Sequence, residues 1–377
     1  MLDPRRYSPA AAAPAPLARL FAVVEDRLGA ATGDAAARID VQLAAELDVM
    51  LAGDGAALAQ LFAGVPSAAV YRHLWRLLAE RERAVIADAA LRVTLFAIPL
   101  VIVTAAEGNG AAPVTLSGVV DDIAGKVAIL REHHALSGNE NFALGNALVA
   151  AAALDVRHLP ALLSMRAWPS SSTPPRELAP APITVSSTTE AVHLRFLVGT
   201  ALAAPTADPL RDQNVGKWGI PFAAAMARDI GAPGVSVLAL PRAPQGLVAA
   251  LWAGRVAQRE VSVQLFASNA IRRLRASVGE PQAVLSMHGP MDGDGGAEVR
   301  LSLSSPFDPR EAEGFRCPLL PQDRVDDVVK MLTDLLRDCR VDSIREMPGL
   351  HADRDPGTGL TLLFKGDALP DDGAQVH

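Results

Sequence analysis

The hydrophobic positions in the first ninety residues recur with the spacing of α-helices. Apolar side chains lie three and four residues apart within residues 39–50, a spacing that places them on one face of a helix. A second stripe, within residues 70–78, follows Ser67, a residue type that favours helix N-termini. We therefore predict that residues 17–167 are mainly helical. Residues 1–16 are rich in alanine and proline and are expected to form a disordered lead-in.

One segment of the first half has the pattern of a β-strand instead. Residues 93–104 are rich in β-branched side chains and predict a strand that is buried on both faces. Because proline has no N–H to donate to a sheet, Pro99 indicates an edge position or a bulge. A lone strand cannot satisfy its backbone groups. We therefore expect this strand to pair with strands from the second half of the chain.

Two helices and a loop are expected in the middle of the chain. Ser117 can cap a helix that runs to about His134. A second helix is predicted over residues 137–155, because Ser137 and Glu140 have the spacing of a capping box. Proline and serine are frequent in residues 168–190, which predicts a long surface loop.

The second half alternates between strand-like and helical patterns. Its strand-like segments are residues 192–200, 235–240, 261–267, 283–287, 299–304 and 360–364. Residues 261–364 then follow the β-α-β-β-α-β order of a ferredoxin-like module, with a glycine-rich hairpin at 288–297 and a helix capped by Asp323. Residues 366–377 are expected to be a flexible tail.

These patterns predict an α/β or α+β fold. In it, the helical N-terminal region packs on a mixed β-sheet, and residues 191–365 form an α/β region with the ferredoxin-like order at its end.

Composition and charge narrow the classes of function. Half of the 377 residues are hydrophobic and 20% are charged, which is enough apolar material for a core. The net charge of −7 disfavours general attraction to nucleic-acid phosphates or anionic membranes. The longest strongly apolar run, residues 93–106, is too short to span a bilayer. Only Cys317 and Cys339 are present, too few for a disulfide framework, so a reducing cytoplasm is expected.

The common signatures of cofactor and metal sites are missing from the sequence. Lys126 follows Gly118 at a spacing that does not match a phosphate-binding loop. No dinucleotide fingerprint, helical zinc motif or nucleophile elbow occurs. We therefore expect neither a cofactor nor a metal.

Polar residues that follow the predicted strands supply one candidate site. If the strands that begin at residues 93, 235, 261 and 283 were parallel in one sheet, their carboxyl ends would share an edge, where α/β proteins bind ligands. The polar residues at those ends are Glu107, Asn109, Arg242, Ser268, Asn269 and His288.

These residue types fit an anionic metabolite. Arg242 would hold the anion through two hydrogen bonds, and a helix N-terminus at Ser268 and Asn269 would assist it. His288 or Glu107 would serve as general base. Turns and helix caps explain the same residues without a ligand.

A second candidate is a basic cluster of Arg272, Arg273 and Arg275, just inside a helix predicted to start near Ser268. Nucleic-acid binding would need aromatic stacking partners, and Phe266 alone is near. A solvated helix face therefore explains the cluster better.

The sequence favours a cytosolic, non-catalytic binding or assembly subunit that works through self-association or a protein partner. The alternatives are an anionic-metabolite binding protein or enzyme, and a nucleic-acid accessory factor.

Overall fold

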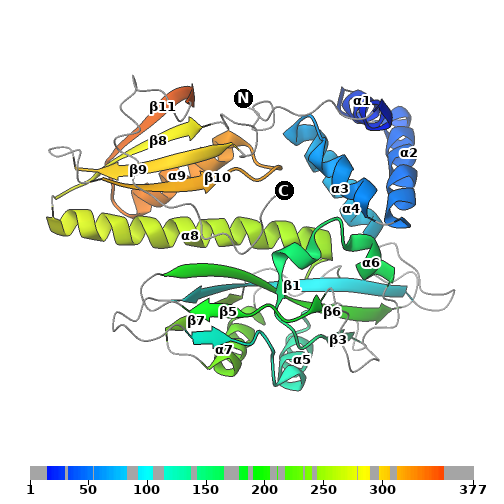
Figure 1. Cartoon of the computed structure of the whole chain (residues 1–377), viewed down its shortest axis with the longest axis horizontal. Helices are drawn as coiled ribbons and strands as arrows, with labels where there is room; N and C mark the ends of the chain where they lie inside the picture. The colour runs from blue at the N-terminus through cyan, green and yellow to red at the C-terminus, as the bar shows by residue number, and fades with distance from the viewer. Residues whose placement is uncertain are drawn as a thin grey trace. The chain divides into compact units, whose positions relative to one another are not determined.

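The computed structural model describes most of the chain as two compact units (Figure 1). The described residues are 15–29, 33–53, 55–82, 92–104, 114–136, 142–164, 178–185, 190–203, 210, 217–231, 234–239, 244–277, 279–288, 297–305 and 312–351. The C-terminal unit takes its described residues from Met1–Thr32, Leu61–Leu74 and Arg259–Asp371, and the central unit takes its own from Gly33–Gln60 and Trp75–Gln258.

A four-stranded sheet forms the framework of the C-terminal unit. Its strand order is β10-β9-β8-β11, with β8 at Gln282–His288, β9 at Glu298–Ser304, β10 at Ala312–Pro318 and β11 at Ser343–His351. β8, β9 and β10 are antiparallel neighbours, whereas β11 runs parallel to β8. A parallel pair needs a crossover connection, and α9, at Val325–Asp338, supplies it. The antiparallel β8–β9 pair confirms the predicted hairpin strands.

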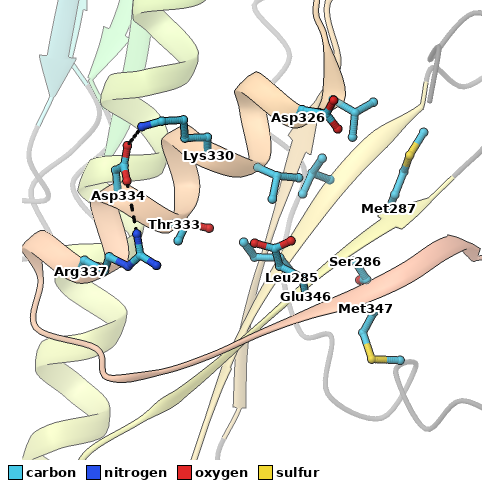
Figure 2. A pocket seen from close by; sticks show the side chains of 13 residues that line it. Leu285, Ser286, Met287, Asp326, Lys330, Thr333, Asp334, Arg337, Glu346 and Met347 are labelled. Carbon is cyan, nitrogen blue, oxygen red and sulfur yellow. Dashed lines mark hydrogen bonds and ion pairs between the residues drawn. The ribbon is translucent and has the colours of Figure 1, made fainter. Parts of the chain in front are cut away.

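Two helices supply the apolar covering of one face of this sheet. The part of α8 (Leu247–Ser277) that belongs to this unit contributes Val263, Ala267 and Leu274 to the core. From α9, Val328, Leu332 and Leu336 join the same cluster, and Figure 2 shows α9 alongside β8 and β11. The spacing of these positions is that of a helix face.

The ferredoxin-like order was wrong. Residues 261–267, predicted as its first strand, lie inside α8. The segment is rich in apolar and β-branched residues, but it continues a helical stretch without a breaker, and burial of one side of the helix against the sheet outweighs strand propensity. The unit also contains β10, which the sequence pattern did not reveal. Residues 360–364 lie outside the described part of the chain.

The central unit is built on a curled antiparallel sheet. Its order is β3-β6-β1-β7, with β4 also pairing with β6. The strands are β1 Arg92–Thr104, β3 Phe142–Leu144, β4 Val149–Ala150, β6 Ala191–Ala203 and β7 Val235–Ala239. β1 pairs with β6 along its whole length, which confirms that this strand takes its partners from the second half. A separate two-stranded sheet joins β2 (Val114–Leu116) to β5 (Ile183–Val185).

Pro99 lies on a central strand, but at a point where that strand has no β7 residue opposite it and is locally an edge. The N–H of Ala97 donates to Gln245 at 2.8 Å, and alternate N–H groups of a strand point to the same side, so the missing donor of Pro99 faces that side. The β1–β7 pairing ends at Leu100, one residue beyond Pro99. The proline is tolerated because it falls in this interruption.

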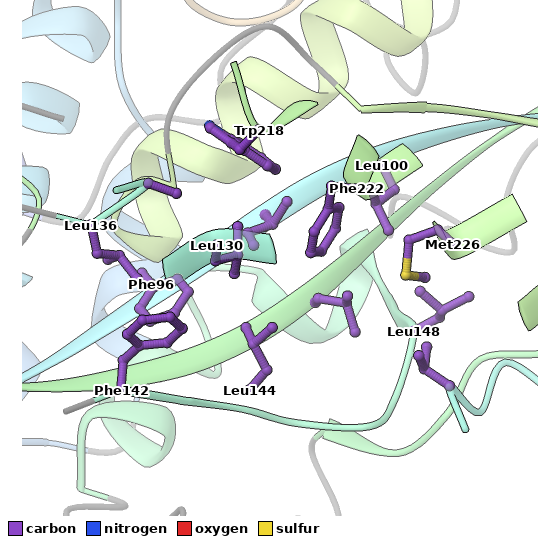
Figure 3. Close-up of a cluster of buried hydrophobic side chains, with 14 of the residues drawn as sticks. Phe96, Leu100, Leu130, Leu136, Phe142, Leu144, Leu148, Trp218, Phe222 and Met226 are labelled. Atoms are coloured by element: carbon purple, nitrogen blue, oxygen red, sulfur yellow. The ribbon is translucent and has the colours of Figure 1, made fainter. Parts of the chain in front are cut away.

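A cluster of buried aromatic and aliphatic side chains packs on one face of the central sheet (Figure 3). Trp218 and Phe222 pack edge to face with ring centres 5.3 Å apart. Phe96 of β1 lies opposite Gly199 of β6, where an added Cβ would come within 2.4 Å of the Phe96 ring. Glycine is therefore required at that position. The helices that contribute to this core are α5, Ile123–Glu132, and α7, Gly219–Ile230.

The N-terminal part of the chain is helical, as predicted. Its helices are α1 Ala15–Gly29, α2 Asp34–Leu51, α3 Ala56–Ala63 and α4 Ala68–Glu82. The hydroxyl of Ser67 accepts a hydrogen bond from the N–H of Val70 at 3.3 Å, which agrees with its expected role as a cap.

The middle of the chain differs from its sequence pattern. Residues 137–155 were predicted as a helix, but their described part contains β3, β4 and a short 3-10 helix at Ala151–Leu154. Phe142 and Leu144 are both buried and pair with β6, so the need of β6 for a partner outweighs the capping-box signal. α5 begins at Ile123 and not near Ser117, because Asp122 caps it through a hydrogen bond from Gly125. The only other helix of this region is α6, at Leu159–Ser164, as far as the described residues go.

Each unit contains a buried ion pair. In the central unit, Lys126 Nζ lies 2.6 Å from Asp229 Oδ2, with the lysine side chain only 1% exposed. In the C-terminal unit, Arg259 pairs with Asp323, and both side chains are 6% exposed. Asp323 also accepts a hydrogen bond from the N–H of Leu320 at 2.6 Å. Asp323 was expected to cap α9, but the helix begins at Val325, and the carboxylate is committed to Arg259 instead.

Candidate functional site

The structure contradicts the parallel arrangement of strands on which the expected ligand site depended. β1 and β7 are antiparallel, residues 261–267 are helical, and β8 belongs to a different sheet. Carboxyl ends of these segments therefore do not meet at one edge of a parallel sheet. Ser268 and Asn269 lie inside α8 and not at a helix N-terminus. The other proposed members, Glu107, Asn109 and Arg242, lie outside the described residues.

His288 ends β8 on the sheet face that α8 and α9 do not cover. Its Nε2 lies 3.0 Å from the hydroxyl of Ser286, and the two residues are only 4% and 3% exposed. Across the strands on the same face, Arg300 donates to Glu298 at 2.6 Å. A serine beside a histidine has the spacing of a nucleophile and a base. Here the pair belongs to a buried polar layer, which agrees with a structural role.

A cavity of about 470 Å³ opens beside α9 on the other face (Figure 2). We call it the β11 pocket. Its apolar walls are Leu285, Met287, Val299, Val325, Val329 and Met347, and its polar walls are Asp326, Lys330, Thr333, Asp334, Arg337 and Glu346. Ser286 also borders the cavity, although its hydroxyl bonds to His288 on the opposite face of the sheet. Its size lies within the range of small-ligand sites.

Local geometry explains why the pocket forms at this place. Glu346 pairs in register with Leu285, and the next paired residue of β11 is Leu350, opposite Met287. The intervening residues form a bulge opposite Ser286, and bulges bend a strand away from its neighbour. Because Leu285 faces the helices and paired residues share a face, the side chain of Glu346 also points toward α9.

Lys330, Asp334 and Arg337 form a row of charges along α9. Lys330 bonds to Asp334, and the Nη1 of Arg337 lies 3.7 Å from the other carboxylate oxygen. The hydrogen bond from Lys330 lowers the pKa of Asp334 below its usual value, and the charge of Arg337 adds to the effect. One carboxylate therefore serves two cations.

A second hollow of about 530 Å³ lies between α9 and α8. We call it the α8–α9 groove. It is lined by Glu260, Gln264, Asp327, Lys330, Met331, Asp334, Leu335 and Asp338. Four carboxylates and one amine give it a negative balance over a partly apolar floor. Both hollows thus border the same exposed side of one helix.

The arginine cluster of α8 is engaged within the protein. Arg273 donates to Glu313 at 2.8 Å, Arg275 to the carbonyl of Arg340 at 2.8 Å, and Arg272 to Asn269 at 2.9 Å. Each guanidinium therefore has an intramolecular partner, as expected of a solvated helix face.

The buried thiol of Cys317 is held in its neutral form. Burial, as the main cause, raises the pKa of Cys317 from 9.0 to about 12, although the charge of Arg259 works in the opposite direction. A thiol is a nucleophile only when it has lost its proton. Cys317 is thus a structural residue at neutral pH.

Stability should decline with pH because of this thiol. The unfolded chain loses the proton near pH 9, whereas the native protein keeps it to about pH 12, so this contribution is intact below pH 9 and is lost above it. We expect the loss to be about 1.4 kcal/mol per pH unit in that window. Urea unfolding between pH 8 and pH 10.5, with Cys339→Ala as the parent and Cys317→Ala added, measures it. Equal pH slopes for the two proteins would contradict the prediction.

Neither a metal centre nor a membrane span emerges from the described part of the chain. No three histidine, cysteine or acidic side chains in it converge as a metal site would require. None of its helices combines the length and apolar character needed to cross a bilayer.

Sequence reasoning did not single out Thr333 or Glu346. The available signal was weak: Thr333 is a polar residue beside the apolar stripe of a predicted helix, and Glu346 follows Arg345 in a segment for which the sequence predicted no element. Only the fold brings them to one cavity. Comparison of the chain with protein-family models, with curated proteins and with solved structures found no match.

Proposed function

We propose that this chain is a non-catalytic binding subunit that acts through protein–protein contacts made by the exposed side of α9. The observation that carries the proposal is the pair of hollows, the β11 pocket and the α8–α9 groove, which share Lys330 and Asp334 on the exposed side of this helix. A partner protein could fill the apolar parts of these hollows with its own side chains, and the charged residues around them would orient it.

The chemistry of the described residues supports binding more than catalysis. Cys317 is protonated and buried, and Asp323 and Arg259 neutralise each other. The Ser286–His288 pair lies in a buried polar layer. These groups contribute to stability, whereas the charges beside α9 are accessible to a partner.

Site-specific photo-crosslinking tests the proposal. A photoreactive residue at Asp327, exposed on α9, should yield covalent protein adducts in extracts of the source cells. The same residue at Asp26, exposed on α1, serves as the matched control. A second substitution in the groove, Asp338→Arg, should reduce the yield of the Asp327 adduct by at least about ten-fold, because reversing a charge at an interface costs about 1.4 kcal/mol or more.

Two results would overturn the proposal. One is the absence of any adduct from Asp327, with a second copy of the chain counted as a partner. The other is covalent labelling of Ser286 by a fluorophosphonate, lost in His288→Ala, because it would show an activated nucleophile and favour an enzyme.

A further inference from the structure

The β11 pocket is shaped for an alkyl chain with a polar end. Leu285, Met287 and Val329 supply apolar surface, and the cavity of about 470 Å³ opens to solvent beside α9. An extended aliphatic chain of four to six carbons is much smaller than this volume and would gain by burial of its methylene groups. The charged groups of the pocket then decide which head group the chain can carry.

The charge left uncommitted in the pocket is negative. Asp334 is shared by Lys330 and Arg337, so these three groups together carry one positive charge, and the two further carboxylates of the lining make the pocket negative by one charge. Asp326 and Glu346 also line the cavity, and no hydrogen bond or ion pair engages either carboxylate within the described part of the chain. A ligand that places a positive charge here is favoured over an anion.

Thr333 adds an unsatisfied hydroxyl to the lining of the same pocket. The residue is 8% exposed, its Oγ1 makes no hydrogen bond, and it lines the pocket. Figure 2 shows its oxygen directed toward the space between α9 and the sheet. A buried hydroxyl without a partner costs free energy, and a ligand that donates a hydrogen bond removes this cost. An ammonium group has three donors.

We propose that the β11 pocket binds a primary alkylammonium group, with its chain along the apolar wall and its head between Glu346 and Thr333. Resting on the function proposed above, the inference adds that the partner supplies this group as a lysine side chain. The four-carbon stem of lysine and its compact charge match the apolar wall and the acidic end.

Binding of n-hexylammonium to the full chain tests the chemistry of the pocket. Titration followed by NMR of the methyl groups of Met287 and Val329 should show saturable shifts. n-Hexanol and hexanoate are probes of equal length, and they should bind at least about ten-fold more weakly because they lack the charge-assisted hydrogen bond.

Matched variants assign the contacts. Glu346→Gln, at an exposed position, should weaken binding of n-hexylammonium by about ten-fold, and Thr333→Val by about three- to ten-fold. Glu46→Gln, on the exposed side of α2, should leave it unchanged. Equal affinity for hexylammonium and hexanol, or full affinity in Glu346→Gln, would overturn the proposal.

A peptide pair separates a partner's lysine from a free amine. Acetyl-Ala-Lys-Ala-amide should displace n-hexylammonium, and the peptide with norleucine in place of lysine should not. Binding of the amine without displacement by the lysine peptide would overturn the lysine assignment. If the amine and the peptide bind but Asp327 yields no crosslink, the function proposed above fails while the ammonium specificity of the pocket stands.

Discussion

Replacement of Asp229 by alanine is expected to lower the free energy of unfolding by about 3–5 kcal/mol, because it leaves a buried ammonium without its counter-charge. Lys126 is 1% exposed, and its Nζ lies 2.6 Å from the Asp229 carboxylate. The same carboxylate accepts a weaker bond from the N–H of Asp122 at 3.3 Å. Urea unfolding monitored by tryptophan fluorescence, to which the buried Trp218 of this unit contributes, measures the change.

Replacement of Lys126 and the double variant separate the effect of the unpaired charge from other effects of the substitutions. Lys126→Met keeps the length of the side chain and leaves Asp229, which is 16% exposed, in contact with water, so its cost should be smaller. The double variant, Lys126→Met with Asp229→Ala, should recover much of the stability that Asp229→Ala loses, because it leaves no buried charge without a counter-charge. A cost below about 1 kcal/mol for Asp229→Ala, the value typical of a surface pair, would contradict the prediction.

A comparable loss, about 3–5 kcal/mol, is expected for Asp323→Ala in the C-terminal unit. Arg259 would then be buried without an anion, and the N–H of Leu320 would lose its acceptor. Burial alone would lower the pKa of Arg259, but the hydrogen bond and charge of Asp323 raise it above the ordinary value. The guanidinium therefore stays charged in the native protein, and its counter-ion cannot be removed cheaply.

Asparagine at the same position separates the two effects. Asp323→Asn keeps an oxygen that can accept from Leu320, but it removes the negative charge and replaces the second oxygen, which accepts from Arg259, by an NH2 group that cannot accept. It should therefore cost less than Asp323→Ala but still more than a surface substitution. Chemical denaturation followed by hydrogen exchange in α9 and β8 localises the effect to this unit. Equal stability of Asp323→Asn and the parent chain would show that the pair contributes no net stabilisation.

Local sequence pattern was sufficient for three strands of the central sheet, of which β1 is buried on both faces. The β-branched run of residues 93–104 became β1, and the segments at 192–200 and 235–240 became β6 and β7. The argument that a lone strand needs partners correctly joined the two halves of the chain. Such runs are informative because burial on both faces demands apolar side chains at every position.

Tertiary packing decided the elements that were predicted wrongly. Val261, Val263 and Phe266 favour a strand locally, but the part of α8 that belongs to the C-terminal unit presents one side to that unit's core, and that burial outweighs the local preference. β3 is only three residues long, and a segment so short has no periodicity of its own. It exists because the edge of β6 requires a hydrogen-bonding partner.

The residues of the candidate site could not be predicted from the sequence for a different reason. The expected site depended on strand order and direction, which a single sequence does not contain. Glu346 and Thr333 lie on different elements and meet only because β11 crosses back to run parallel to β8. His288 was singled out from its place after a strand, and the structure pairs it with Ser286 within the same strand.

The bulge in β11 also affects how the sheet can associate. β11 is an edge strand of the described sheet, and exposed edges can recruit strands from other molecules, the first step of uncontrolled aggregation. An incoming strand would have to match the irregularity between Glu346 and Leu350 and bury the inward-facing carboxylate of Glu346 without a counter-ion, which costs several kcal/mol. This edge is therefore protected against growth by main-chain pairing, and any specific association on this side of the molecule must be made through side chains.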